Sequence, residues 1–359
     1  MSKRMGTMTD RQRVEALLNH RKPDRVPIWP FALLGFPALY SKLTITEAYT
    51  NPEASYAAQR KTCQDFGWVF FPGIGYAAFG AWEFGGEIKW PSGEFDQAPK
   101  VVRYPIEKDE DVYNLKWPTP DSGILPIGRK SAMLARQERL DNEPFNASIG
   151  SGGSFTLAAN VAGIERFLRW LIKKPELAHY LLRFVTDWRL AGLPHQRETL
   201  GIDGVLPMGG GATESNQLIS AKQFEEFALP SLKEVQEKVL SLGYKTTFIH
   251  ICGEQNANLP YWSQVDFGDP GIISIGHEVK LETAAKYFPD DIIYGNLDPA
   301  IIQNGTPEEV YEATRKVVEE GKKIEGGYIF SPGCDLPPRS PVENLRMMTQ
   351  AVNDYGCYD

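Results

Sequence analysis

The sequence predicts an α/β fold, a (β/α)8 barrel of the TIM type, and three observations lead to this prediction. The chain has 359 residues, a length that such barrels reach as one domain. Short apolar runs rich in β-branched and aromatic residues recur along it, which is typical of parallel strands buried on both faces. Helical patterns separate most of these runs. We therefore expect residues 1–359 to form a single barrel domain.

The eight predicted strands are the segments 26–29, 68–71, 145–149, 204–207, 246–251, 271–275, 292–295 and 327–330. The 33 Gly and 26 Pro residues are compatible with the many turns that this chain needs. The carboxyl ends of the strands form the active-site face of a (β/α)8 barrel. The residues that follow these segments are therefore the first candidates for function.

The predicted helices are the segments 11–20, 51 or 52 to 65, 161–199, 220–242, 306–321 and 341–354. Thr9 or Asp10 is the expected N-cap of the first helix, and Ser220 that of the fourth. Pro175 is expected to divide 161–199 into two helices. Gly243 ends the fourth helix, as glycine often does.

Residues 76–121 are less regular and rich in Trp, Gly and Pro. We interpret them as an insertion or lid near the barrel mouth that contains a β-hairpin, rather than as a separate domain. The prediction is compositional, because no clear strand–helix alternation runs through this segment.

Charge and hydropathy exclude several classes of partner. The net charge of −8 repels phosphate backbones, so we expect no nucleic acid to bind. No apolar run reaches the roughly 18 residues that span a bilayer, so no membrane association is expected. Residues 1–10 lack the apolar core of a signal peptide, which predicts a cytoplasmic protein. The four cysteines are then more typical of thiols or metal ligands than of disulfides.

A candidate zinc site follows two of the predicted strands. His250 and Cys252 are two residues apart, so on a strand both side chains point to the same face. Cys334 follows the last predicted strand and could reach the same ion from a nearby position. Imidazole and thiolate are ligands that hold zinc tetrahedrally, and a catalytic zinc keeps one position open. The alternative is a buried histidine with two core cysteines, which is common in proteins.

Four sequence motifs carry a resemblance to a known family. They are His-Ile-Cys-Gly at 250–253, Gly-Asn-Leu-Asp-Pro at 295–299, Ser-Pro-Gly-Cys at 331–334, and the opening at 11–18 with Pro-Asp-Arg-Val-Pro at 23–27. Together they resemble the uroporphyrinogen decarboxylase-like superfamily over almost the whole chain. The His-x-Cys pair with a distant Cys resembles its zinc-dependent, corrinoid-linked methyltransferases, which include methylcobamide:coenzyme M methyltransferases and O-demethylating methyltransferases.

This resemblance implies two cofactors. Zn²⁺ would be held by His250, Cys252 and Cys334. The corrinoid (cobalamin) would be supplied by a partner, because the chain contains no Asp-x-His-x-x-Gly cobalamin-binding motif. The expected partners are therefore a corrinoid carrier protein and a small-molecule methyl donor or acceptor.

Three reactions compete within the resemblance. We favour transfer of a methyl group from a methoxylated aromatic compound to the corrinoid protein, an O-demethylation. The first alternative is transfer from the methylcorrinoid to a thiol such as coenzyme M. A decarboxylase of the uroporphyrinogen type is disfavoured, because residues 26–41 contain no charged side chain to hold a polycarboxylate. A barrel that only binds a corrinoid carrier, with structural cysteines, is the non-enzymatic alternative.

Substrate and catalytic residues are expected at the strand ends. Aromatic side chains near the first two strands could line an apolar pocket or could simply be core, and we assign to substrate binding Trp29, Phe31, Phe36 and Tyr76, together with Asn296. His277 and Glu278 follow the sixth strand and are the candidate catalytic residues. Either could occupy the fourth zinc position, donate a proton or hydrogen-bond a neighbour.

Overall fold

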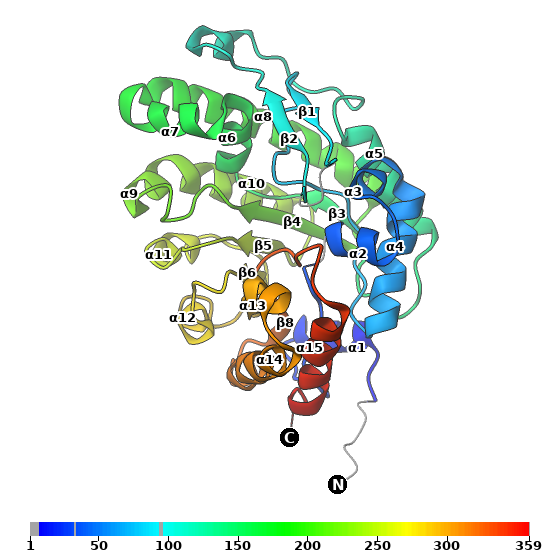
Figure 1. Ribbon diagram of the computed structural model, residues 1–359. Helices are drawn as coiled ribbons and strands as arrows, with labels where there is room; N and C mark the ends of the chain where they lie inside the picture. Colours follow the sequence, from blue (N-terminus) through cyan, green and yellow to red (C-terminus); the bar gives the residue numbers. More distant parts are fainter. Residues whose placement is uncertain (1–6, 32–33, 93–95, 359) are drawn as a thin grey trace.

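A six-stranded parallel sheet forms the centre of the computed structural model, which describes residues 7–31, 34–92 and 96–358 (Figure 1). The strands lie side by side in chain order: β3 Ala147–Gly150, β4 Val205–Gly211, β5 Phe248–Ile251, β6 Ile272–Ile275, β7 Ile292–Leu297 and β8 Tyr328–Pro332. Each corresponds to one of the predicted strands. The predicted α/β class with parallel strands is confirmed.

The first two predicted strands are extended segments rather than regular strands. Segment 26–29 continues the sheet beyond β8, because Ile28 bridges Phe330 in the parallel sense and the Trp29 N–H donates to the Phe330 carbonyl at 3.0 Å. The Val69 N–H donates to the Ile28 carbonyl at 2.8 Å, which adds segment 68–71. Pro27, Pro30 and Pro72 lie in or beside these segments and remove the donors that a longer ladder needs.

Aromatic rings fill the space between segment 68–71 and β3, where the described part of the chain forms no ladder. The Phe71 and Phe145 ring centroids are 6.3 Å apart, and Trp29 lies 5.6 Å from Phe71 and 6.1 Å from Phe145. These rings belong to an interior core with residues of the central strands, such as Phe248 and Tyr294. The two edges of the curved sheet therefore meet through side chains.

Helices cover the outer face of the sheet, as the alternating pattern predicts (Figure 1). The helices are α1 Asp10–Leu17, α2 Gly35–Tyr40, α3 Ile45–Thr50, α4 Pro52–Phe66, α5 Leu125–Gln137, α6 Phe155–Ala162, α7 Ile164–Lys173, α8 Pro175–Leu200, α9 Ala221–Gln223, α10 Leu229–Ser241, α11 Leu259–Trp262, α12 Leu281–Tyr287, α13 Pro299–Asn304, α14 Pro307–Gly321 and α15 Val342–Tyr355. Residues Phe224–Ala228 form a π-helical turn between α9 and α10, and Asp109–Asn114 form the 3-10 helix η1.

The helix boundaries follow the predicted caps. The Thr9 side chain accepts a hydrogen bond from the Gln12 N–H, and Ser220 accepts one from the Gln223 N–H. The division near Pro175 is confirmed, since α7 ends at Lys173 and α8 begins at Pro175. A second break at Gly163 was not predicted. Its φ of 86° lies in the region that favours glycine, and it separates α6 from α7.

The segment 76–121 contains the expected hairpin, an antiparallel pair of β1 Glu87–Lys89 and β2 Lys100–Arg103. The buried carboxylate of Glu83 holds its base, because it accepts hydrogen bonds from the Tyr76 hydroxyl at 2.8 Å, the Gly80 N–H at 2.6 Å and the Ile124 N–H at 3.1 Å. Whether this segment acts as a lid over the mouth stays a prediction.

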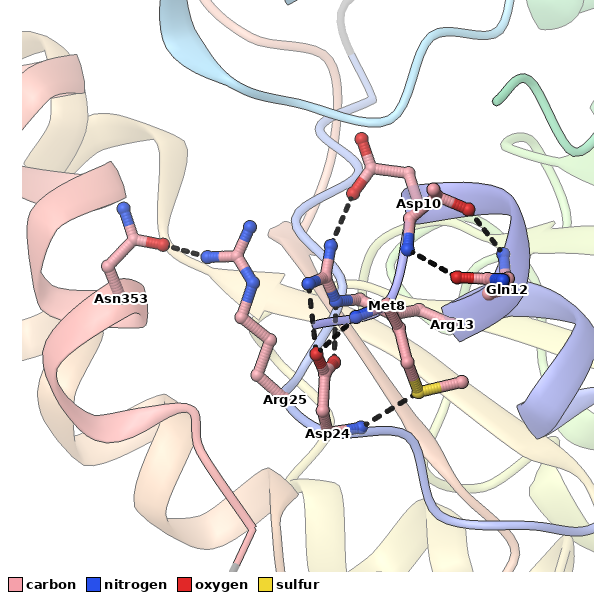
Figure 2. Close-up of polar contacts among 8 residues, drawn as sticks. Met8, Asp10, Gln12, Arg13, Asp24, Arg25 and Asn353 are labelled. Carbon is pink, nitrogen blue, oxygen red and sulfur yellow. Dashed lines mark hydrogen bonds and ion pairs between the residues drawn. The ribbon is translucent and has the colours of Figure 1, made fainter. Parts of the chain in front are cut away.

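At the amino end of the barrel, a polar cluster that we call the N-terminal clamp (Met8, Asp10, Arg13 and Asp24) ties α1 to the first extended segment (Figure 2). Arg13 is 5 % exposed, and its three guanidinium nitrogens bind Asp24 at 2.7 and 3.2 Å and Asp10 at 2.9 Å. The Met8 N–H also donates to Asp24, at 2.8 Å. Burial acts to raise the pKa of Asp24, but these hydrogen bonds hold it below its ordinary value.

The neighbouring Arg25 extends this connection to the end of the chain, because it donates to the Asn353 side chain on α15 (Figure 2). The motif at 23–27 therefore has a structural reason: it joins the first and last helices at the base of the sheet. Among the described residues, no helix combines the length and apolar character needed to cross a lipid bilayer.

Candidate metal centre

Three predicted ligands meet at the carboxyl end of the sheet. His250 lies on β5, Cys252 directly follows that strand, and Cys334 directly follows β8. Their ligand atoms all lie within 4.8 Å of one another, and the two Sγ atoms are 3.7 Å apart. Both cysteines are free thiols. The structure thus brings together residues that are 82 positions apart in the chain.

Strand alternation and two glycines place these side chains. On β5, Ile249 and Ile251 face the helices, so His250 faces the interior with Phe248. Gly253 has a φ of 76°, which lets the chain turn directly after Cys252. A Cβ on Gly333 would lie 2.7 Å from the backbone nitrogen of His277, so only glycine lets the loop after β8 pack this closely. Cys334 is the next residue.

The imidazole of His250 is oriented from one side and unpartnered on the other. Its Nδ1 lies 2.8 Å from the hydroxyl of Ser274, the residue opposite it on β6. Ser274 is only 1 % exposed and can accept the Nδ1 proton, which leaves the Nε2 lone pair free. Nε2 is buried and has no hydrogen-bond partner in the described part of the chain. A buried nitrogen of this kind needs a ligand to satisfy it.

The two thiols act as one pair. Their mutual hydrogen bond lowers the pKa of Cys334 and raises that of Cys252, so the pair loses its first proton more readily than its second. Each thiol is partly buried, which adds to the cost of a second charge. A cation in contact with both sulfurs would remove this cost.

This donor set fits zinc. Zinc prefers sulfur and imidazole nitrogen in a tetrahedron, and two sulfurs bound at about 2.3 Å would then be separated by about 3.8 Å. The observed Sγ–Sγ separation of 3.7 Å matches that value. The unpartnered Nε2 supplies the third donor. Within the described ranges, no further His, Cys, Asp or Glu joins the three ligands, which leaves the fourth position to another group.

The two candidate catalytic residues flank this cluster. His277 has a side chain that is 42 % exposed, and it lies between two acids: Nδ1 is 3.5 Å from Glu278 and Nε2 is 3.9 Å from Asp298. The Glu278 carboxylate helps to raise the pKa of Cys252, after the larger effects of the Cys334 hydrogen bond and burial. Glu278 therefore lies close enough to act on the centre through its charge, whereas His277 faces the acids and solvent.

An aromatic cavity of about 200 Å³ opens beside the centre. Its wall contains the two predicted residues Trp29 and Phe31, and also Phe71, Met208, Phe248 and Tyr294. Phe31 connects the cavity to the metal centre, since its ring stacks on His250 with centroids 4.9 Å apart and an interplanar angle of 19°. The Ser331 hydroxyl accepts the Phe31 N–H at 3.0 Å and fixes that ring in place.

Three predicted substrate residues are not in the wall of this cavity. Phe36 packs against Tyr40 at 5.6 Å in the outer core, and the Tyr76 hydroxyl donates to Glu83. The Asn296 amide donates to the carbonyls of Gly276 at 3.1 Å and Val279 at 2.7 Å, so it braces the loop that carries His277. The structure gives each of these side chains a packing or bracing partner, which composition alone could not reveal.

Two serines have roles that the sequence did not indicate, although Ser331 belongs to the motif at 331–334. Ser274 and Ser331 orient His250 and Phe31, and each interrupts or follows an apolar run that was interpreted only as a buried strand. A lone hydroxyl in such a run, one strand away from a candidate ligand, is the signal that could have identified Ser274.

Comparison with known proteins agrees with this architecture. The sequence pattern of the uroporphyrinogen decarboxylase (URO-D) family matches residues 9–355. A methylcobamide:CoM methyltransferase, MtbA of Methanosarcina acetivorans, is 30% identical over 273 residues, which cover 76% of each chain. Another, MtaA of Methanosarcina barkeri, is 27% identical over 360 residues and 98% of this chain, 99% of its own.

More distant relatives also match over almost the whole chain. A uroporphyrinogen decarboxylase of Anaeromyxobacter sp. is 24% identical over 357 residues, 93% of this chain and 95% of that protein. The solved structure of a methyltransferase from Methanosarcina mazei superposes with a TM-score of 0.80 at 20% identity, over 97% of this chain and 99% of that one. That likeness shows a common fold. By its sequence pattern over residues 9–355 and by this fold, the chain belongs to the uroporphyrinogen decarboxylase family.

Proposed function

We propose that this protein is a zinc-dependent methyltransferase that moves a methyl group from a corrinoid carried by a partner protein to a small thiol. The observation that carries the proposal is the cluster of His250, Cys252 and Cys334, with its unpartnered buried Nε2. The relatives named methylcobamide:CoM methyltransferase support the reaction type. They favour the thiol acceptor over the methoxylated aromatic that the composition of the strand ends had favoured.

His250, Cys252 and Cys334 would hold the zinc. A bound zinc lowers the pKa of an added thiol, so that the sulfur is available as a thiolate near neutral pH. Ser274 keeps the imidazole in the orientation that ligation requires. Gln255 donates to the Cys252 carbonyl at 3.1 Å and fixes the turn that presents this sulfur.

The other residues of the mouth bind the thiol and remove its proton. The aromatic wall around Phe31 and Trp29 excludes water from the reacting sulfur. Glu278 accepts the proton that the thiol loses, and His277 passes it towards Asp298 and solvent. Methyl transfer to the thiol sulfur would form the C–S bond as the carbon–cobalt bond of the partner's methylcorrinoid breaks, and the electron pair of that bond would stay with the corrinoid.

Decarboxylation of a polycarboxylate has little support at this mouth. The described lining of the aromatic cavity contains no Lys or Arg, so several carboxylates would find no cation there. Demethylation of a methoxylated aromatic is the second candidate, because the same cavity offers a flat apolar wall for a ring.

The test compares metal content with methyl transfer in the purified protein. We expect one zinc per chain and methyl transfer from methylcobalamin to 2-mercaptoethanesulfonate. The substitutions Cys252→Ser and Cys334→Ser should each remove the zinc and lower the rate by at least about 100-fold. Cys357→Ser is the matched control, because that thiol lies outside the cluster.

Two results would contradict the proposal. Zinc that persists in both serine variants would refute the ligand assignment. If cob(I)alamin takes a methyl group from a methoxylated aromatic and no thiol accepts one from methylcobalamin, the second candidate replaces the first.

A further inference from the structure

The aromatic cavity lies one layer of side chains away from the metal centre, towards the amino end of the strands. On β5, Phe248 lines the cavity, and His250 is the next inward-facing residue, roughly 7 Å further along the strand. Met208 on β4 is paired with Phe248 and lines the same cavity. Phe31 lines it as well, and its ring stacks on His250 with centroids 4.9 Å apart. A short linker would therefore join a group in this cavity to an atom bound at the centre.

Two polar side chains of the cavity wall are already hydrogen-bonded within the protein. The Gln59 amide donates to the Ser55 hydroxyl at 3.0 Å and to the Gly73 carbonyl at 3.1 Å, and its oxygen accepts the Gly73 N–H at 3.0 Å. The Tyr294 hydroxyl is hydrogen-bonded to Ser331. Because these groups need no ligand, the cavity offers its occupant mainly apolar surface.

Among the described residues, no charged side chain lines the cavity. Arg189 of α8 lies at the end of β3, where a Cβ on Gly150 would be 3.3 Å from its Nη1, and it is not part of the cavity wall. A carboxylate or sulfonate that entered the cavity would lose its hydration without gaining a cation. The cavity therefore favours an uncharged group.

Two glycines leave one wall of the cavity without side chains. Gly73 and Gly75 both line it, and a Cβ built on either would meet no atom within 4 Å. Neither has a positive φ, so the backbone does not require glycine at these positions. A cavity of about 150 Å³ with apolar walls is enough to bind benzene. This cavity, of about 200 Å³, has room for one aromatic ring and a short linker.

We propose that the aromatic cavity binds an uncharged aromatic ring carried by the thiol that accepts the methyl group. This inference rests on the proposed function and specifies the acceptor as an aryl-substituted thiol. The rings of Trp29, Phe31 and Phe71 line the cavity and offer the edge and face contacts that aromatic groups prefer. Such an acceptor differs from the anionic coenzyme M for which the methylcobamide:CoM methyltransferase relatives are named.

The first test compares phenylmethanethiol with 2-mercaptoethanesulfonate in steady-state kinetics of the zinc-loaded protein with methylcobalamin. Burial of the ring should make the KM of phenylmethanethiol at least about tenfold lower. Gly75→Leu adds an apolar side chain in the open space and should raise that KM by at least about tenfold, while that of 2-mercaptoethanesulfonate stays unchanged. Gly128→Leu is the matched control, because it makes the same change in open space on α5.

A second variant narrows the cavity from another wall. Ser148 lines the cavity from β3, and Ser148→Leu should have the same selective effect on phenylmethanethiol. The result then does not depend on Gly75→Leu alone. Zinc content should equal that of the wild type in both variants, because neither residue belongs to the ligand cluster.

Binding measured by calorimetry without a corrinoid keeps this inference separate from the reaction. Wild-type protein should bind phenylmethanethiol at least about tenfold more tightly than Gly75→Leu does, whether or not methyl transfer occurs. Failure of transfer to every thiol would contradict the proposed function. Equal affinity of the wild type and both narrowed variants for phenylmethanethiol would overturn only this inference.

Two kinetic outcomes would also overturn it. An equal loss with both thiols in Gly75→Leu and Ser148→Leu would show that these changes act on folding or on access to the centre, and not on a ring. Transfer of a methyl group from methoxybenzene to cob(I)alamin that is lost in the same two variants would assign the ring to the methyl donor.

Discussion

An arginine at each end of the barrel differs from the other in whether its guanidinium has partners. At the amino end, all three guanidinium nitrogens of Arg13 are bound by Asp24 and Asp10 (Figure 2). At the carboxyl end, Arg189 has no hydrogen bond or ion pair among the described residues. The imidazole of His250 repeats the contrast within one ring, with Nδ1 bound and Nε2 unpartnered.

This difference separates structural from functional polar groups. A buried group that is fully paired stabilises the fold, and its desolvation is offset within the chain. A buried group without a partner costs free energy in the free protein and regains it when a ligand arrives. The N-terminal clamp and the metal centre should therefore respond differently to substitution: the first through stability, the second through binding.

The largest expected effect is at the clamp. Asp24→Asn removes the charge that holds Arg13 and should lower the free energy of unfolding by about 3 kcal/mol, because it leaves a buried guanidinium underpaired. Urea denaturation measures this change. Asp121→Asn is the control, since the exposed pair with Arg129 should contribute less than about 1 kcal/mol.

Zinc content should be the same in Asp24→Asn as in the wild type. If Asp24→Asn kept its stability but lost zinc, the clamp would not act through stability alone, and the proposed difference between the two ends would be wrong.

The next effect depends on pH and concerns Glu214 at the mouth. Burial raises the pKa of this carboxyl from 4.5 to about 7. Between these values the folded chain binds more protons than the unfolded chain, so the contribution of Glu214 to stability is full below about pH 4.5 and is lost as the pH rises through 7. Glu214→Gln cannot ionise, and its stability relative to the wild type should increase by at most about 3 kcal/mol over this window.

Unfolding measured at a series of pH values checks this prediction. Glu165→Gln on α7, where the side chain is 91% exposed, should show no such trend. A relative stability of Glu214→Gln that falls as the pH rises would reverse the sign and contradict the burial argument.

The smallest effect sharpens the contrast within His250. Ser274→Ala removes the group that orients the imidazole and should weaken zinc binding by about tenfold. Competition with a chromophoric chelator measures this affinity. Ser331→Ala should leave it unchanged, because that hydroxyl positions Phe31 and contacts no ligand. Equal losses of zinc affinity in both variants would mean that general packing at the mouth, rather than the Ser274 hydroxyl, sets the affinity.

Local patterns predicted much of the fold. The apolar runs that form β3 to β8 are short and continuous, and such runs can be recognised as buried strands without knowledge of the partner strands. The segments 26–29 and 68–71 have similar composition, yet their prolines prevent a regular ladder. Short helices such as α11 Leu259–Trp262 were not predicted, because four residues are too few to show a helical period.

The candidate site also contains residues that the sequence could predict and residues that it could not. The two-residue spacing of His250 and Cys252 is readable from the sequence, because strand geometry has a period of two. Phe36 and Tyr76 were assigned to substrate from composition, and aromatic residues look alike whether they line a cavity or fill a core. The sequence gives no sign of which of the two environments each ring enters.

By itself the sequence determined the parallel α/β framework, the acidic charge and a sulfur–imidazole donor set, because these depend on composition and on spacing within one element. Only the tertiary structure decided that Cys334 joins His250, that Ser274 orients it and that Arg189 stays unpartnered beside Gly150. The physical reason is that hydrogen-bond satisfaction depends on neighbours from distant segments, and a residue's own position in the chain does not contain that information.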